Sequence, residues 1–259
     1  MKDTSAVTSD KGRQGPGLAK GADNAKKLRY CDKLLADQRE HTYLYQGSDY
    51  AEDLFSTICH SSGISEPHVE LDLLQTDRFT IEEMASNPVS LRFLQFLVRA
   101  SNTRRVLEIG AFIGVSAIYL ARALPADGEV VTIEKFDHFA KIARQNFSRN
   151  GVAGKVRLIE GDAREVLATL PRDKPFDLVF IDGNKERYKE YVELTEPLLS
   201  PRGIVAVDDC FFHGDAVNGQ PSSEKGAGVR AVLRYAATRE DLLRIALPLA
   251  NGILLMMRR

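Results

Sequence analysis

The sequence lacks long apolar runs. No stretch approaches the roughly 18 consecutive apolar residues that a membrane-spanning helix needs. Residues 1–20 are polar and contain no hydrophobic core of a secretion signal. These absences exclude a membrane-spanning protein and predict a cytoplasmic one.

Cysteine is also scarce. The chain has three cysteines, Cys31, Cys59 and Cys210, and their odd number and wide spacing fit neither a disulfide framework nor a CxxC zinc site. We therefore predict that they are ordinary reduced thiols.

The chain has no excess of positive charge. Its formal net charge is -1 and its pI is near 6.5, whereas constitutive nucleic-acid binders usually present a basic surface to phosphates. The charge balance argues against a nucleic-acid partner and favours chemistry on small molecules.

What the chain does contain is enough apolar material for one core. With 259 residues and 44% hydrophobic content, it fits a single globular domain with an appendage. Residues 1–27 have almost no large apolar side chains, which predicts a disordered tail. Residues 28–81 hold short amphipathic stretches broken by Gly47, Gly63 and Pro67, typical of a helical extension. The main domain is expected over residues 82–259, without internal repeats.

Strand and helix patterns alternate through this domain. A helix is expected after Pro88, capped by Asn87 or Ser86. Short apolar runs then alternate with amphipathic segments, which is typical of a doubly wound α/β fold with a parallel sheet covered on both faces. The expected strands are 105–109, 130–133, 156–159, 176–181 and 203–207, and the expected helices are 116–124, 136–150, one after Asp162, and 186–199.

The C-terminus departs from this alternation. Residues 242–249 and 253–257 are strand-like and flank Ala250-Asn251-Gly252. Asn-Gly is a strong hairpin signal, so we expect a terminal antiparallel hairpin, with one strand inserted beside the other.

Acids and glycines follow the predicted strands, where doubly wound sheets bind their ligands. Gly110 and Gly114 allow a tight turn after the first strand, with G-x-x-x-G spacing in place of the G-x-G-x-x-G of dinucleotide folds. Glu134 ends the second strand, where an acid can accept both hydroxyls of a ribose; the alternative is a solvated loop acid. Asp162 and Ala163 follow the third strand and could meet an adenine edge. Asp162 and Glu165 also form a helix-capping pair, and both roles can coexist.

The order of these motifs resembles class I S-adenosylmethionine-dependent methyltransferases. Leu107-Glu108-Ile109-Gly110, the segment Phe180 to Tyr188 and Val207-Asp208-Asp209 are similar, more narrowly, to the caffeoyl-CoA and catechol O-methyltransferase family. The likeness covers roughly residues 80–259 and implies a Rossmann-like, seven-stranded sheet. It implies that S-adenosylmethionine is bound by Met84, Ser86, Glu108, Gly110, Gly114, Ser116, Glu134, Asp162, Ala163 and Asp182.

The resemblance also implies a metal site. Asp182 ends the fourth strand and Asp208-Asp209 the fifth, so three carboxylates from neighbouring strand tips could converge and repel one another. A hard divalent cation relieves such repulsion: Mg²⁺ is expected, with Ca²⁺ and Mn²⁺ as alternatives. The third ligand in the family is commonly Asn, and Asp209 makes this site more anionic. Ordinary loop capping is the alternative for the Asp208-Asp209 pair.

The implied reaction is methyl transfer to one of two vicinal hydroxyls of a catechol-like phenol that chelate the metal. Lys185 aligns with the catalytic lysine of the family and could take the hydroxyl proton or hold the oxygen by a hydrogen bond. Phe212, or its neighbour Phe211, is expected to contact the flat substrate ring, with core packing as the alternative. A homodimer is also implied. His213, a lone loop histidine, carries no predicted role.

Other functions remain open at this point. An NAD-dependent oxidoreductase is opposed by the glycine spacing and leaves the three aspartates without a role. A tRNA hydroxyuridine O-methyltransferase on the same scaffold is possible, because basic residues such as Lys11, Arg13 and Lys20 could hold phosphates. A catalytically silent interaction protein is disfavoured by the intact acid and lysine set.

Overall fold

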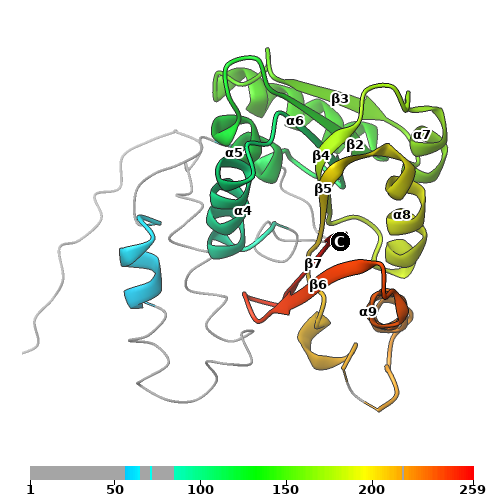
Figure 1. Cartoon of the computed structure of the whole chain (residues 1–259). Helices are drawn as coiled ribbons and strands as arrows, with labels where there is room; N and C mark the ends of the chain where they lie inside the picture. Colours follow the sequence, from blue (N-terminus) through cyan, green and yellow to red (C-terminus); the bar gives the residue numbers. More distant parts are fainter. Residues whose placement is uncertain (1–55, 65–70, 72–84, 218) are drawn as a thin grey trace, which may run out of the picture.

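The fold was obtained as a computed structural model that describes residues 56–64, 71, 85–217 and 219–259 (Figure 1). The predicted tail at 1–27, most of the predicted extension at 28–81, and Met84 lie outside these described residues. Within the extension, residues 56–61 are helical.

Strands and helices alternate through the described residues from 85 onward, in the predicted α/β order. The strands are β1 (Arg105–Ile109), β2 (Glu129–Glu134), β3 (Val156–Glu160), β4 (Phe176–Ile181), β5 (Leu199–Val207), β6 (Leu242–Leu247) and β7 (Ile253–Arg258). The α-helices are α4 (Pro88–Ala100), α5 (Val115–Ala123), α6 (Asp137–Arg149), α7 (Ala163–Thr169), α8 (Tyr188–Thr195) and α9 (Glu224–Thr238), with 3-10 turns η2 (Lys185–Arg187), η3 (Glu196–Leu198) and η4 (Phe212–Gly214).

The strands form one seven-stranded sheet in the order β3-β2-β1-β4-β5-β7-β6. β1 to β5 pair in parallel, whereas β7 pairs antiparallel with both β5 and β6. The predicted seven-stranded Rossmann-like sheet and its inserted C-terminal strand are both confirmed. Because β1, β2, β4 and β5 are parallel, their carboxyl ends meet at one edge.

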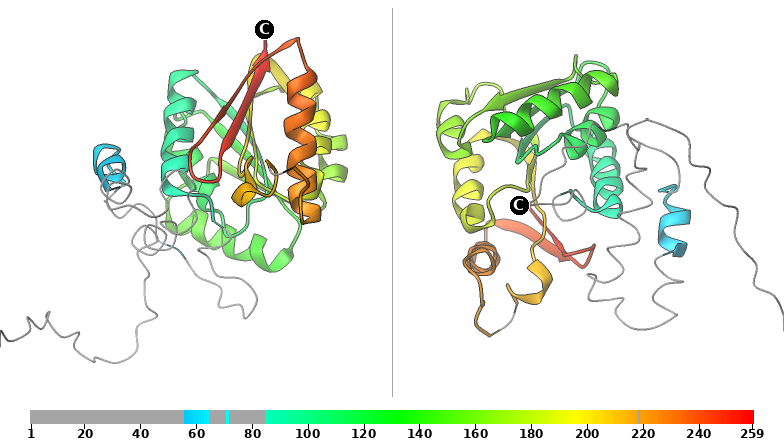
Figure 2. Two further views of the ribbon diagram at one scale, coloured as in Figure 1. Left: turned by 90° about the horizontal axis from the view of Figure 1, so that it is seen from below. Right: turned by 180° about the vertical axis from the view of Figure 1, so that it is seen from behind.

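Helices cover both faces of the sheet (Figure 2). Successive side chains of a strand point to opposite faces, so Val106 of β1 packs with α4, α5 and α6, while Leu107 and Ile109 pack with α7, α8 and α9. These side chains are at most 1% exposed. Burial on both faces explains why the parallel strands read as continuous apolar runs in the sequence.

The first predicted helix is confirmed together with its cap. The side chain of Asn87 accepts a hydrogen bond from the backbone N–H of Val89 at 2.7 Å, and Pro88 opens α4. Val89 packs against the buried residues Cys59 and Ile64, which joins the short helix at 56–61 to the domain.

The structure differs from the sequence expectation at two helices. The single helix expected at 186–199 is divided into η2, α8 and η3. α8 ends at Thr195 because Pro197 has no N–H with which to continue an α-helix. Helix α9, which begins at Glu224, was not predicted. Its signals are the N-cap Ser223, which accepts from Gly226 N, and the buried residues Val229, Val232 and Ala236 at helical spacing.

No helix among the described residues is long and apolar enough to cross a membrane.

Candidate active site

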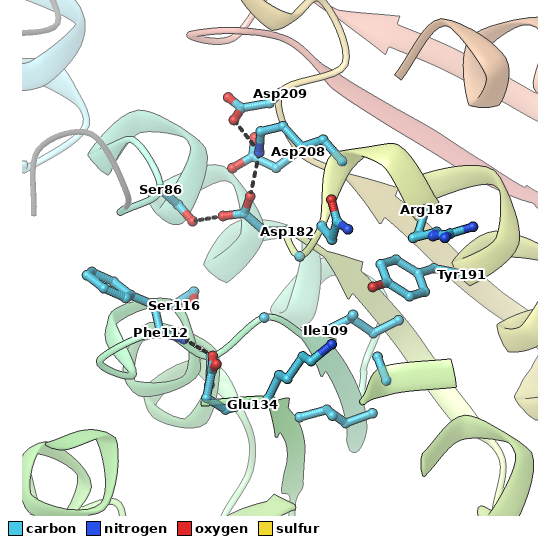
Figure 3. Close-up of a pocket in the computed structure, with 18 of the residues that line it drawn as sticks. Ser86, Ile109, Phe112, Ser116, Glu134, Asp182, Arg187, Tyr191, Asp208 and Asp209 are labelled. Atoms are coloured by element: carbon cyan, nitrogen blue, oxygen red, sulfur yellow. Dashed lines mark hydrogen bonds and ion pairs between the residues drawn. The ribbon is translucent and has the colours of Figure 1, made fainter. Parts of the chain in front are cut away.

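A cavity of about 1010 Å³ opens at the carboxyl ends of the parallel strands (Figure 3). Glu134 lies at one end of it, and Asp182, Asp208 and Asp209 gather at the other, with Ser86 beside Asp182. The tips of β1, β2, β4 and β5 therefore bring most of the predicted site residues into one space, which is where a doubly wound sheet holds its ligand.

Gly110 allows the chain to turn at the tip of β1. Its φ is +99°, and a Cβ at this position would lie 2.4 Å from the carbonyl oxygen of Asp182. Only glycine permits both this backbone conformation and this close approach. The tip of β1 can therefore lie against the backbone of Asp182, after β4, only with glycine at position 110.

Gly114 and Glu108 lie behind the cavity wall and do not line it. A Cβ on Gly114 would meet the ring of Phe147 at 2.4 Å, so this glycine lets α5 pack on α6. Glu108 is fully buried, and its carboxyl is hydrogen bonded by Thr132 and Ser116. Burial raises the pKa of Glu108 to about 7. Both residues support the wall; any contact with a cofactor by either one stays a prediction.

Glu134 is held rigidly at the tip of β2. Its Oε2 accepts from the backbone N–H of Phe112 at 2.8 Å, and its Oε1 accepts from that of Phe136 at 2.9 Å. Burial raises the pKa of this carboxyl, although the backbone donors oppose the shift. The side chain is thus an oriented acceptor at the cavity, in place of the solvated loop acid that the sequence left open.

Asp162 caps α7, as the sequence allowed. It accepts from the backbone N–H and the guanidinium of Arg164 and from Nζ of Lys135, 3.1 Å away. The hydrogen bonds from Arg164 hold its pKa well below the ordinary value. Asp162 and Ala163 both line the cavity, so the capping role and a role toward a ligand are compatible.

Lys185 lies among the acids at the other end of the cavity. Its Nζ is 2.7 Å from Oδ2 of Asp209, 3.3 Å from Oδ1 of Asp182 and 3.1 Å from Oη of Tyr188. Asp182 also accepts from Oγ of Ser86 at 3.0 Å. The predicted convergence of the strand tips therefore appears as an ion-pair cluster built around one lysine.

The electrostatics of this cluster are unbalanced, because one ammonium faces three carboxylates. Burial, followed by the charges of Asp182 and Asp209, raises the pKa of Asp208 well above its ordinary value. Burial also raises the pKa of Asp182. For Asp209, burial is outweighed by Lys185, and its pKa is lowered. Asp182 and Asp208 therefore hold a proton more tightly than an ordinary aspartate does, whereas Asp209 holds one less tightly.

The donor set suits a hard divalent cation, because carboxylate oxygens are its preferred ligands and the acids outnumber the lysine. As the side chains stand, no three acid, histidine or cysteine side chains within the described ranges form a group that could hold a metal ion. The fit therefore rests on the chemistry of Asp182, Asp208 and Asp209, and the metal stays a prediction.

The loop after β5 has an unusual backbone. The φ angles of Asp209, Phe212 and His213 are 53°, 43° and 51°. These values lie in the left-handed region, which residues other than glycine seldom adopt. This conformation turns Asp209, Phe212 and His213 onto the cavity wall. The ring centroid of Phe212 is 6.0 Å from Nζ of Lys185, which places the predicted substrate-contact residue beside the predicted catalytic one.

Sequence reasoning missed two residues of this site. Tyr188 is fully buried and contacts Lys185, and Asn251 lines the cavity from the turn between β6 and β7. Tyr188 was part of the motif behind the family resemblance but received no role. Asn251 was interpreted only as a turn residue, because nothing in its local sequence shows what the turn packs against.

Comparisons with known proteins find O-methyltransferases. The O-methyltransferase family profile matches residues 60–259. A catechol O-methyltransferase of Mycobacterium tuberculosis is 36% identical over 177 residues, which cover 68% of this chain and 80% of that protein.

Solved structures share the fold. The O-methyltransferase TomG of Streptomyces achromogenes, involved in tomaymycin synthesis and solved in complex with SAM, aligns with a TM-score of 0.65 and 29% identity over 88% of this chain and 98% of its own. An O-methyltransferase from Bacillus cereus in complex with SAH is 24% identical, with a TM-score of 0.64, and covers 88% of this chain and 100% of its own; it supports the fold alone.

The match extends over most of the chain and includes every strand of the sheet and every acid of the cavity. The predicted resemblance is confirmed: the chain belongs to the O-methyltransferase family and is an enzyme of that family.

Proposed function

We propose that this enzyme transfers a methyl group from S-adenosylmethionine to a hydroxyl oxygen of a catechol-like small molecule, with a divalent cation, Mg²⁺ in the first place, held by Asp182, Asp208 and Asp209. The observation that carries the proposal is a cluster of three carboxyl groups near Lys185, at one end of a cavity whose other end is formed by Glu134. Asp208 is buried, and Asp182 and Asp209 are partly buried.

The Glu134 end suits the nucleoside of the donor. Its carboxylate, fixed by two backbone N–H groups, has lone pairs left for the two ribose hydroxyls. Ala163 and Asp162 lie next to it for the adenine, and Ser86, at the other end, lies beside Asp182 for the methionine part. The SAM bound to TomG, which is 29% identical to this chain, supports this donor.

The acid end suits a phenolic acceptor. A divalent cation, when bound there, would lower the pKa of the acceptor hydroxyl and orient its oxygen. Lys185 has a pKa well above its ordinary value, because the nearby carboxylates, Asp209 first, outweigh the opposing effect of burial. We therefore assign it a hydrogen bond to the acceptor oxygen, which holds that oxygen in line with the sulfonium methyl. The ring of Phe212 forms a wall against which a flat acceptor can pack.

The test is methyl transfer from labelled S-adenosylmethionine to a panel of dihydroxylated phenols, with added Mg²⁺ or with EDTA. We compare the wild type with Asp182→Asn and with Asp137→Asn, a change of an exposed aspartate outside the cavity. We expect methyl transfer by the wild type and by Asp137→Asn in the presence of Mg²⁺, and its loss in EDTA and in Asp182→Asn. Transfer that persists unchanged in EDTA would contradict the metal, and failure with every phenol would contradict the acceptor class.

The homodimer implied by the resemblance is part of the same proposal. Light scattering at micromolar concentration tests it, and a monomeric mass would contradict it.

A further inference from the structure

The turn between β6 and β7 is bonded to the loop that carries Asp209. The backbone N–H of Phe211 donates to the carbonyl of Asn251 at 2.7 Å, and that of Cys210 donates to the carbonyl of Gly252 at 2.9 Å. A Cβ on Gly252 would lie 2.5 Å from the ring of Phe211. The turn and the loop after β5 therefore form one closely packed unit at the rim of the cavity.

The side chain of Asn251 points from this turn into the acid end of the cavity. It forms a side-chain hydrogen bond to the carboxylate of Asp209. Its Nδ2 lies 3.5 Å from Nε2 of His213, and its Oδ1 is shielded from solvent. A residue more than 40 positions along the chain from Asp209 thus reaches the carboxylate directly.

Asp209 depends on such support. Its left-handed backbone, with φ of 53°, fixes the direction in which its side chain leaves the loop. Lys185 holds Oδ2 of Asp209 on one side at 2.7 Å, and Asn251 is a neutral partner from a different element. A carboxylate with two fixed partners keeps one orientation, whereas a carboxylate with one partner can rotate about its side-chain bonds.

We propose that Asn251 is a positioning residue, which orients the carboxylate of Asp209 as a ligand for the divalent cation and thereby ties the C-terminal hairpin to the metal site. This inference rests on the proposed function. Asn251 then has two roles, one in the Asn-Gly turn and one on Asp209. The two roles can be separated, because backbone carbonyls of the turn, and not the side chain of Asn251, accept the hydrogen bonds from Cys210 and Phe211.

The experiment measures Mn²⁺ binding to the full chain by the loss of the free-ion EPR signal, without turnover. The variants are Asn251→Ala, which removes the amide, and Asn251→Ser, which keeps a turn residue and a short donor. Ile245→Ala, on the same hairpin and 53% exposed, is the matched control. Calorimetry of S-adenosylhomocysteine binding and thermal melting check the fold of each variant.

We expect Mn²⁺ affinity to fall about 10-fold in Asn251→Ala, the order found when a partner of a metal ligand is removed. Asn251→Ser should fall between this variant and the wild type, and Ile245→Ala should match the wild type. Binding of S-adenosylhomocysteine should stay within about 2-fold of wild type in all three. If Asn251→Ala does not fold, the Mn²⁺ affinity of Asn251→Ser decides.

Two outcomes separate the inference from the proposed function. If the wild type binds Mn²⁺ and the Asn251 variants bind it equally well, the inference is wrong and the metal site stands. If the wild type itself binds no Mn²⁺, the metal part of the proposed function is wrong and the inference falls with it.

Discussion

Nζ of Lys185 and Oδ2 of Asp209 lie 2.7 Å apart, although the two residues follow different strands, β4 and β5. Lys185 thus neutralises part of the acid cluster, and it is also the residue to which we assign a hydrogen bond to the acceptor oxygen. Structural and chemical roles coincide in one side chain, and a variant can separate them.

We expect Lys185→Met to lower kcat for methyl transfer by a factor of about 10² to 10⁴, the range for loss of a group that handles the reacting proton. Donor binding should change little, because Lys185 lies at the acid end of the cavity. Lys189→Met is the control, since Lys189 pairs with Glu193 on the exposed side of α8. Steady-state kinetics with calorimetry of S-adenosylhomocysteine binding measures both effects, and equal losses of kcat in the two variants would refute the assignment.

Glu134→Gln should weaken donor binding with little effect on kcat at saturating donor. The charged acceptor for the ribose hydroxyls becomes a neutral amide, and a hydrogen bond to a charged group contributes about 1.5–3 kcal/mol. We therefore expect about a 10-fold or larger rise in the dissociation constant for S-adenosylhomocysteine, measured by calorimetry. Glu160→Gln, an exposed position at the end of the neighbouring strand β3 and outside the cavity lining, should bind as the wild type does. Unchanged binding by Glu134→Gln would exclude it from the ribose site.

Gly110→Ala should destabilise the fold and abolish donor binding. The added Cβ would lie 2.4 Å from the carbonyl oxygen of Asp182, on a residue with φ of +99°. We expect a loss of about 3 kcal/mol, which corresponds to a fall in Tm of roughly 6–12 °C for a domain of this size. Gly154→Ala is the control, because nothing lies within 4 Å of a Cβ there. Thermal melting of both variants decides, and similar Tm values would show that the turn tolerates a side chain.

Glu108 should make the stability of the ligand-free enzyme depend on pH. Burial raises its pKa from 4.5 to about 7, so the folded state binds more protons than the unfolded state between these values. Its contribution to stability is complete below about pH 4.5 and is lost as the pH rises through 7. The shift corresponds to about 3 kcal/mol.

Glu108→Gln removes this titration. The unfolding free energy of the wild type relative to Glu108→Gln should fall by about 3 kcal/mol between pH 5 and pH 8, measured by urea denaturation at a series of pH values. A constant difference between wild type and Glu108→Gln across this range would mean that Glu108 is charged in the folded state.

The order of strands and helices could be predicted because it depends on local pattern. Strands such as β1 and β4 are buried on both faces, and this burial leaves a run of apolar residues that is visible in the sequence. The position of Glu134 and of the three aspartates could also be predicted, because residues that follow parallel strands must reach the same edge of the sheet. The break at Pro197 and the helix α9 were missed, although Pro197 and Ser223 carried local signals for both.

Residues that act across the fold were beyond the sequence. Whether Gly114 touches a ligand or packs on Phe147 depends on how α5 and α6 meet, and the sequence pattern is the same in both cases. Asn251 reaches Asp209 only because β7 inserts between β5 and β6 and carries the hairpin turn to the rim of the cavity.

The sequence by itself determined the elements, the parallel sheet and the edge at which the acids gather, since these depend on hydrophobic periodicity and on the residues at strand ends. Only the tertiary structure decided which side chains share a hydrogen bond there, because such contacts depend on packing between elements far apart along the chain.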